Sequence, residues 1–258
     1  MKPLFAISRS LFAIPCSLLA VLLFASCSNK YNIDGTSSVT SLDGKLLSLR
    51  TMTENGEWIA VDSAGVEHGS FKMSGEVDSV IMVMLCLNDD AIMPVILERG
   101  HMKLSISNAD ARVSGTPLNN ALYEFIDRRN ELQSRLNELE RRETQLILEG
   151  GNYDEIQAEI AAEAKTLSEE ASTQVKSFIT DNYENILGPS VFVMLYGSLP
   201  YPIMTEQIED IMRTAPMSFK ENVFVKNYLS TAKENMKRIE EQRKLEESSR
   251  ATANAALK

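Results

Sequence analysis

The feature that most constrains this fold is a change of hydrophobic period near Thr116. Up to about residue 115, apolar residues alternate with polar ones or form short runs bounded by Gly, Asn and Asp. This pattern predicts consecutive antiparallel strands. After Thr116, apolar residues recur every three or four positions, which is the spacing of one helix face. The sequence therefore predicts an α+β protein, in which an antiparallel β-sandwich or open barrel precedes an all-helical region.

The β-rich domain is expected to cover residues 27–115. Turn signals such as Asn55-Gly56 and Asn88-Asp89 divide it into short apolar segments. The segment Val80–Leu87 is apolar on both faces, which predicts a central strand covered on both sides. The predicted strands are Lys45–Met52, Glu57–Asp62, Ser70–Met73, Ser79–Leu87, Ile92–Leu97 and Met102–Ile106.

The helical region is expected to cover residues 116–258. Thr116 is a suitable N-cap, and Pro117 suits a first helical turn because its missing N–H has no partner there. Two apolar stripes separated by Gly150-Gly151 predict a long antiparallel hairpin over residues 117–181. Compact helices are expected over residues 186–215. A capping box at Ser218 predicts a last helix over residues 218–250.

The first 26 residues have the pattern of an export signal. The apolar run Leu11–Phe24 follows two basic residues and is too short to span a bilayer comfortably. It ends in Ala25-Ser26-Cys27, which resembles the bacterial lipoprotein signal. This resemblance implies that Cys27 becomes the mature N-terminus and carries acyl chains such as palmitate, so that it anchors the protein to a membrane. The alternative is an ordinary secretory signal with a chance cysteine.

The residues after Cys27 bear on localisation. Similarity to lipoprotein sorting rules implies that Ser28, in place of Asp, directs the protein to the outer membrane. Residues 28–32 also lack the acidic run that resembles a surface-export tag. The sequence favours the periplasmic side of the outer membrane and leaves the cell surface open as the alternative.

The composition excludes one class of partner. Lys and Arg number 26 against 36 Asp and Glu, a formal charge of -10. Nucleic-acid binding needs a basic surface. DNA and RNA are therefore not expected partners, and the expected ones are the membrane and a protein of the envelope.

No residue pattern predicts catalysis or a cofactor. Met82, Met84 and Cys86 share a strand face and could in principle bind Cu(I), although a buried core is the favoured interpretation. His68 and His101 lie beside turn glycines, where exposed turn residues are common. The acidic turn Asn88-Asp89-Asp90 has too few ligands for a Ca²⁺ site. Cys27, the lipid anchor, is the single predicted site residue.

Several motifs of the β region carry a family resemblance. They are Asp62-Ser63, Gly69-Ser70-Phe71-Lys72-Met73-Ser74-Gly75, Leu97-Glu98-Arg99-Gly100 before Met102–Ile106, and Val113-Ser114-Gly115-Thr116-Pro117. Together they resemble the domain-of-unknown-function family 4369, found in Bacteroidetes-type envelope lipoproteins ahead of a thioredoxin-like module in thiol-disulfide oxidoreductases. Here a charged helical segment is expected where those proteins have that module.

Three functions are compatible with the sequence. The favoured one is a non-enzymatic envelope lipoprotein that acts as a binding or interaction module facing the periplasm. An accessory role in thiol–disulfide exchange follows only from the resemblance, and Cys86 would be the single thiol besides the anchor. A small-ligand site in the β domain would leave no sequence signature.

Overall fold

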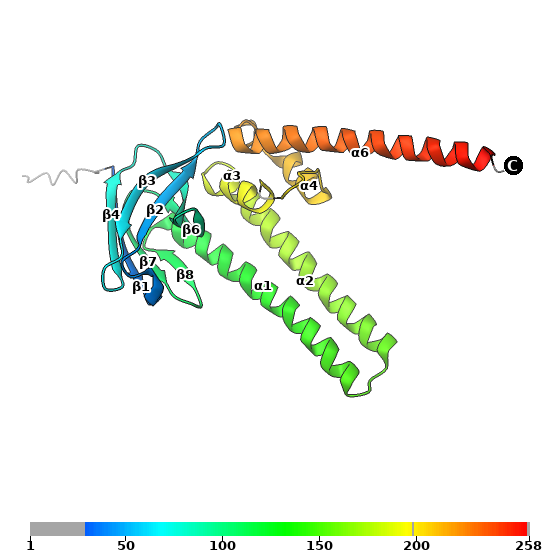
Figure 1. The fold of residues 1–258 in the computed structure, drawn as a ribbon, viewed down its shortest axis with the longest axis horizontal. Helices are drawn as coiled ribbons and strands as arrows, with labels where there is room; N and C mark the ends of the chain where they lie inside the picture. The colour runs from blue at the N-terminus through cyan, green and yellow to red at the C-terminus, as the bar shows by residue number, and fades with distance from the viewer. Residues whose placement is uncertain (1–28, 198, 257–258) are drawn as a thin grey trace, which may run out of the picture.

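The computed structural model describes residues 29–197 and 199–256, and the predicted signal peptide and Cys27 lie outside them. The described chain has a β-sandwich at one end, from which a helical hairpin and a long last helix extend (Figure 1). The predicted α+β class and the sandwich followed by helices are confirmed.

Two four-stranded sheets form the sandwich. The first has the order β4-β1-β7-β8 and the second the order β3-β2-β5-β6. The strands are β1 (Lys30–Ser37), β2 (Leu46–Met52), β3 (Trp58–Gly65), β4 (Ser70–Glu76), β5 (Ile81–Leu87), β6 (Asp90–Leu97), β7 (Gly100–Ile106) and β8 (Ala111–Ser114). A 3₁₀ turn, Thr40–Leu42, follows β1.

Two strands and one pairing differ from the sequence-based expectation. β1 and β8 are not among the six predicted strands, and β1 pairs with β7 in parallel. The inward positions of β1 are Tyr31, Ile33 and Gly35, so its apolar signal is short. Gly35 is required for space, because an added Cβ would lie 2.2 Å from the ring of Phe71. A strand whose third inward position is empty is hard to recognise from periodicity alone.

The prediction that β5 is central is confirmed. It lies between β2 and β6, and Val83 and Leu85 are buried between the two sheets. Ser48 and Arg50 of β2 lie opposite Cys86 and Met84 on its other face. The interior of the sandwich is filled by apolar side chains of both sheets.

The helical region begins with the predicted hairpin. Helix α1 (Pro117–Leu148) and helix α2 (Tyr153–Asp181) are antiparallel and joined by a short turn. Asn152 caps α2, because its Oδ1 accepts from the backbone N–H groups of Asp154 and Glu155. The remaining helical elements are α3 (Leu187–Phe192), a π-helical turn (Val193–Gly197), α4 (Glu206–Thr214), α5 (Met217–Lys220) and α6 (Val223–Ala256).

The predicted capping box at Ser218 is wrong. Ser218 lies inside the short helix α5, and α6 begins five residues later, at Val223. Asn222 caps α6 instead, since its Oδ1 accepts from the N–H groups of Phe224 and Val225. An Asn side chain competes well for such orphan donors, so it ends one short helix and starts the next.

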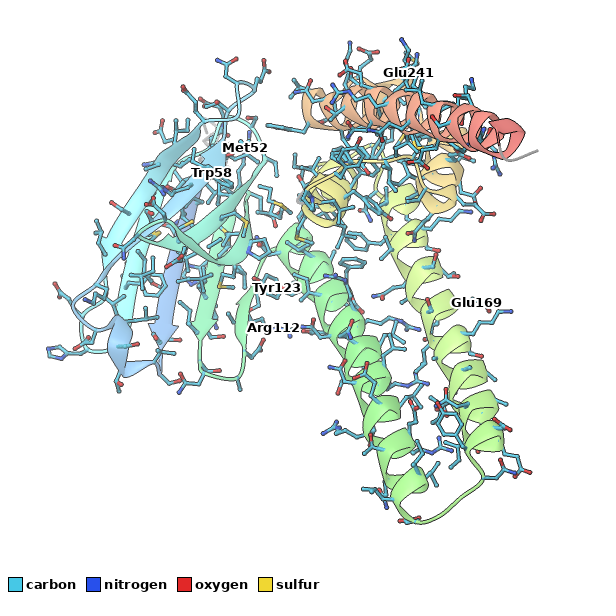
Figure 2. The ribbon with its side chains drawn as sticks, turned by 45° about the vertical axis from the view of Figure 1, so that its right-hand side comes forward. Met52, Trp58, Arg112, Tyr123, Glu169 and Glu241 are labelled. Carbon is cyan, nitrogen blue, oxygen red and sulfur yellow. The ribbon has the colours of Figure 1, made fainter. Side chains whose placement is uncertain are left out.

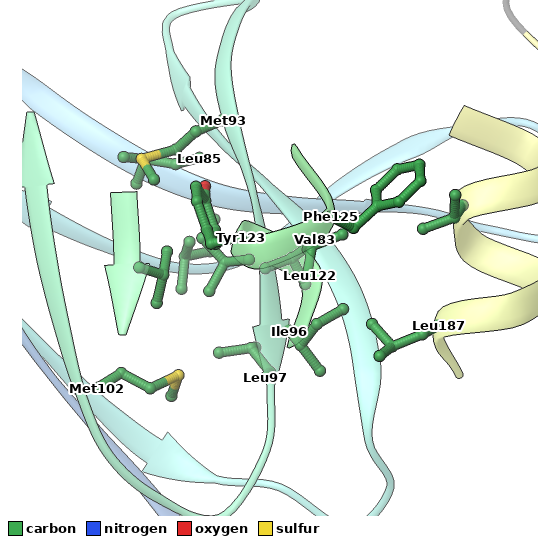
Figure 3. Close-up of a cluster of buried hydrophobic side chains, with 14 of the residues drawn as sticks. Val83, Leu85, Met93, Ile96, Leu97, Met102, Leu122, Tyr123, Phe125 and Leu187 are labelled. Atoms are coloured by element: carbon green, nitrogen blue, oxygen red, sulfur yellow. The ribbon is translucent and has the colours of Figure 1, made fainter. Parts of the chain in front are cut away.

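One continuous apolar core joins the sandwich to the base of the helices. Leu122 and Phe125 of α1 pack with Ile96 and Leu97 of β6 and with Leu187 of α3 (Figure 3). Five aromatic rings close the helical side of this core in edge and tilted contacts. They come from the α2–α3 loop, α3, the π-helical turn, α5 and α6, and are Tyr183, Phe192, Tyr196, Phe219 and Tyr228. A separate small cluster holds the outer hairpin together and contains Leu132, Leu139, Ile156, Ile160 and Leu167.

Candidate functional site

The joint between sandwich and hairpin is built on Asn119, which is fully buried at the start of α1. Its Oδ1 accepts from the N–H of Ile96 at 2.9 Å, and its Nδ2 donates to the C=O of the same residue at 2.8 Å. The side-chain amide of Asn119 thus makes the two hydrogen bonds that a neighbouring strand would make at the edge of β6. Because both backbone groups of Ile96 would otherwise be buried without partners, this contact fixes where the hairpin leaves the sandwich.

Glu98 completes the joint from the end of β6. Its Oε1 accepts from the N–H groups of Leu118 and Asn119 at 2.9 and 3.1 Å, so a carboxylate lies at the N-terminus of α1. Thr116 stands at the predicted cap position, but its side chain accepts from the Asn119 Nδ2 and caps no backbone N–H. Beside this joint, Arg112 of β8 pairs with Asp127 and lies over the Tyr123 ring (Figure 2).

Cys86 is buried and is the only cysteine among residues 29–256. Its thiol donates to the C=O of Met84, and burial raises the pKa of the thiol above its ordinary value. A protonated, covered thiol is a poor nucleophile. The Arg50 side chain lies opposite Met84 on this face, which disfavours a bound metal cation beside these sulfur atoms.

The histidines and the acidic turn lie at separate places on the surface. His68 has a positive φ of 50° in the turn before β4 and is exposed. His101 Nε2 lies 3.1 Å from Asp34 Oδ2, and both side chains are about half exposed. Asp89 is paired with Arg50 at 2.7 Å. In the described part of the chain, no three His, Cys, Asp or Glu side chains converge as a metal site.

The helical arms carry many exposed charged side chains. We define the hairpin arm as residues 128–170 and the α6 arm as residues 236–249. Across the hairpin arm, Arg128 and Arg135 pair with Glu170, and Arg142 pairs with Glu159 and Glu163. A shallow charged depression beside Arg142 is open to solvent. These exposed pairs orient the two helices and add little stability each.

Apolar side chains are nevertheless exposed on both arms. At the tip of the hairpin arm, Leu148 is 82% exposed, and Ile147 and Tyr153 flank the same turn. On the α6 arm, Leu245 is 66% exposed, and Met236 and Ile239 are also exposed. Sequence periodicity placed these residues on helices but could not show that their faces have no neighbour in the fold.

Cys27, the predicted lipid anchor, lies outside the described residues. The first described residue, Asn29, is fixed to the sandwich, because its C=O accepts from the N–H of Val77 at 2.7 Å. Among the described helices, none combines the length and the apolar character needed to cross a bilayer.

Comparison with known proteins identifies the β-rich part of the chain. No curated protein and no solved structure matches it. One family model does match, over residues 31–122, which span the sandwich from β1 to the first six residues of α1 and include the Asn119 joint. Residues 31–122 are therefore similar to the domain of unknown function DUF4369.

Proposed function

We propose that this protein is a non-enzymatic lipoprotein of the cell envelope whose helical arms bind a partner protein. Acyl chains on Cys27 hold it at the outer membrane, on the periplasmic side. The sandwich is the rigid base, and the hairpin arm and the α6 arm are the binding elements.

The observation that carries this proposal is the pair of exposed apolar groups on the arms. Met236, Ile239 and Leu245 on α6 lie among charged side chains of both signs, and Ile147, Leu148 and Tyr153 at the hairpin tip lie beside acidic residues such as Glu149 and Asp154. Apolar residues framed by charges are typical of protein-binding surfaces. Both arms extend beyond the shared core, so a partner could reach them without disturbing the sandwich (Figure 1).

Site-specific photo-crosslinking in intact cells tests the role of the arms. A photoreactive phenylalanine replaces Leu148 on the hairpin arm or Leu245 on the α6 arm. Leu46, which is 62% exposed on the sandwich, gives the matched control position. We expect a discrete adduct from at least one arm position and none from Leu46. Absence of arm adducts, or the same adducts from Leu46, would contradict the proposal.

The anchor is tested by Cys27→Ser, with Cys16→Ser in the predicted signal peptide as the matched control. The Cys27→Ser protein should lose labelling by a fatty-acid analogue and leave the membrane fraction, whereas the Cys16→Ser protein should keep both properties. Retention of Cys27→Ser in membranes would show that acyl chains at this residue do not hold the protein.

A further inference from the structure

We propose that one end of the sandwich lies on the bilayer, with Trp58 and its neighbours in the membrane interface. This inference rests on the proposed anchor at Cys27. The membrane-facing end is defined here by Trp58, Ile59 and Val61 of β3 and by Val80 before β5. These four side chains are 52%, 47%, 41% and 40% exposed.

Backbone pairing places Trp58, Ile59 and Val80 at the same end. Val61 lies further along β3, at the bulge opposite Leu49 and Arg50. Trp58 pairs with Met52 at the end of β2, and the neighbouring Thr51 donates through its Oγ1 to the C=O of Met82 at the start of β5. Val80 therefore lies across β2 from Trp58. Figure 2 shows Trp58 and Met52 together at one end of the sandwich.

The described chain also begins at this end. Asn29 is bonded to Val77, three residues before Val80, and the hydroxyl of Tyr31 donates to Asp62 of β3 at 2.7 Å. Two peptide units separate Cys27 from Asn29, which limits their Cα separation to about 7 Å in any conformation. An acylated Cys27 thus holds this end close to the lipid headgroups.

Of five large apolar side chains exposed on the strands and loops of the sandwich, only Leu46 lies at the other end, where it pairs with Gly65. Leu46 is thus separated from Met52 by the length of β2, about 20 Å. Trp58 is the single tryptophan of the chain. An indole ring suits the boundary between headgroups and acyl chains, because one edge is apolar and the N–H needs a polar partner.

The charges around the membrane-facing end specify the lipid. The exposed charged residues of its loops and strand ends are two basic ones, Lys30 and Arg99, and four acidic ones, Glu54, Glu57, Glu76 and Asp78. This net negative charge is repelled by an anionic surface. The contact is therefore apolar, and it should favour zwitterionic headgroups.

Because Trp58 is unique, its fluorescence gives a direct test. Residues 27–258 with Cys86→Ala are coupled through Cys27 to a maleimide lipid in zwitterionic vesicles, some of which contain lipids brominated near the headgroup. The control protein carries Cys27→Ser, Cys86→Ala and Leu46→Cys, and is coupled at the other end of the sandwich. Chemical coupling makes this test independent of whether cells acylate Cys27.

We expect the Cys27-coupled protein to show a blue-shifted Trp58 emission and at least twofold quenching by the brominated lipids, with no increase when anionic lipid is added. The Leu46→Cys protein should show neither effect. Equal emission from the two coupled proteins would overturn the inference. Shifts that grow with surface density and are equal in both orientations would also overturn it, because a second copy would then cover Trp58.

Discussion

The base of this molecule and its arms are stabilised by different forces. The base, made of the sandwich, the start of α1, the end of α2 and the elements from α3 to the first half of α6, shares one continuous apolar core. The outer hairpin has only a small cluster of five buried side chains, and the α6 arm is held mainly by ion pairs within the helix, such as Glu240–Arg243 and Arg243–Glu247. Apolar burial is the main stabilising force in folding, whereas exposed ion pairs contribute little.

The base therefore supplies the stability that the chain needs to fold, whereas the arms supply the surface that we propose for a partner. The base should unfold cooperatively, because its residues share one core. The arms can open locally at lower free energy. Exposed apolar side chains on elements of low local stability are suited to partner binding, since the partner supplies the missing contacts.

The largest effect is expected from Phe192→Ala in the base. Phe192 is fully buried and its ring contacts Tyr196, Phe219 and Tyr228. Truncation should lower the free energy of unfolding by about 3–5 kcal/mol, because a cavity remains in a packed core. Chemical denaturation followed by the near-ultraviolet circular dichroism of the buried tyrosines in the base and by Trp58 fluorescence should show both transitions shifted together. Two separate transitions would contradict a shared core.

A smaller and local effect is expected from Leu132→Ala in the hairpin arm. Leu132 is 2% exposed within the outer cluster. Its truncation should destabilise the hairpin by about 2–3 kcal/mol, the low end for such a change, because solvent surrounds this cluster. Limited proteolysis should then cut between residues 128 and 170 while the Trp58 transition is unchanged. Leu148→Ala, at an exposed position of the same arm, is the control and should behave as the parent.

The smallest effect concerns the α6 arm and pH. Hydrogen bonds from Arg243 and Lys244 lower the pKa of Glu240 below its ordinary value of 4.5. Because the pKa of Glu240 is lowered in the folded state, the stabilisation of α6 by its ion pairs is fully present above the unfolded-state pKa. It is lost as pH falls through the folded-state pKa. Helical signal should therefore decline slightly on acidification below about pH 4.5, and Glu240→Gln should remove part of that decline. An unchanged decline would show that these pairs do not support α6.

Sequence periodicity predicted most of the fold, because strands and helices with one buried face repeat their apolar residues at fixed spacing. It missed β1, where Gly35 leaves room for Phe71. It also predicted Ser218 as the N-cap of the last helix, whereas Asn222 caps α6. The Asn119 joint could not be predicted, because its partner Ile96 is 23 residues away and becomes adjacent only in the folded chain. The exposure of the arm tips could likewise not be predicted, because periodicity shows which residues share a helix face but not whether another element packs against that face.

Native-state hydrogen–deuterium exchange tests the distinction between base and arms most directly. We expect amides of β5 and α3 to exchange only through global unfolding. Amides near the hairpin turn at Gly150 and those of α6 beyond Asn235 should exchange at least a hundredfold faster. Exchange at one common rate across these four segments would contradict the account, because the arms would then be as stable as the core that carries them.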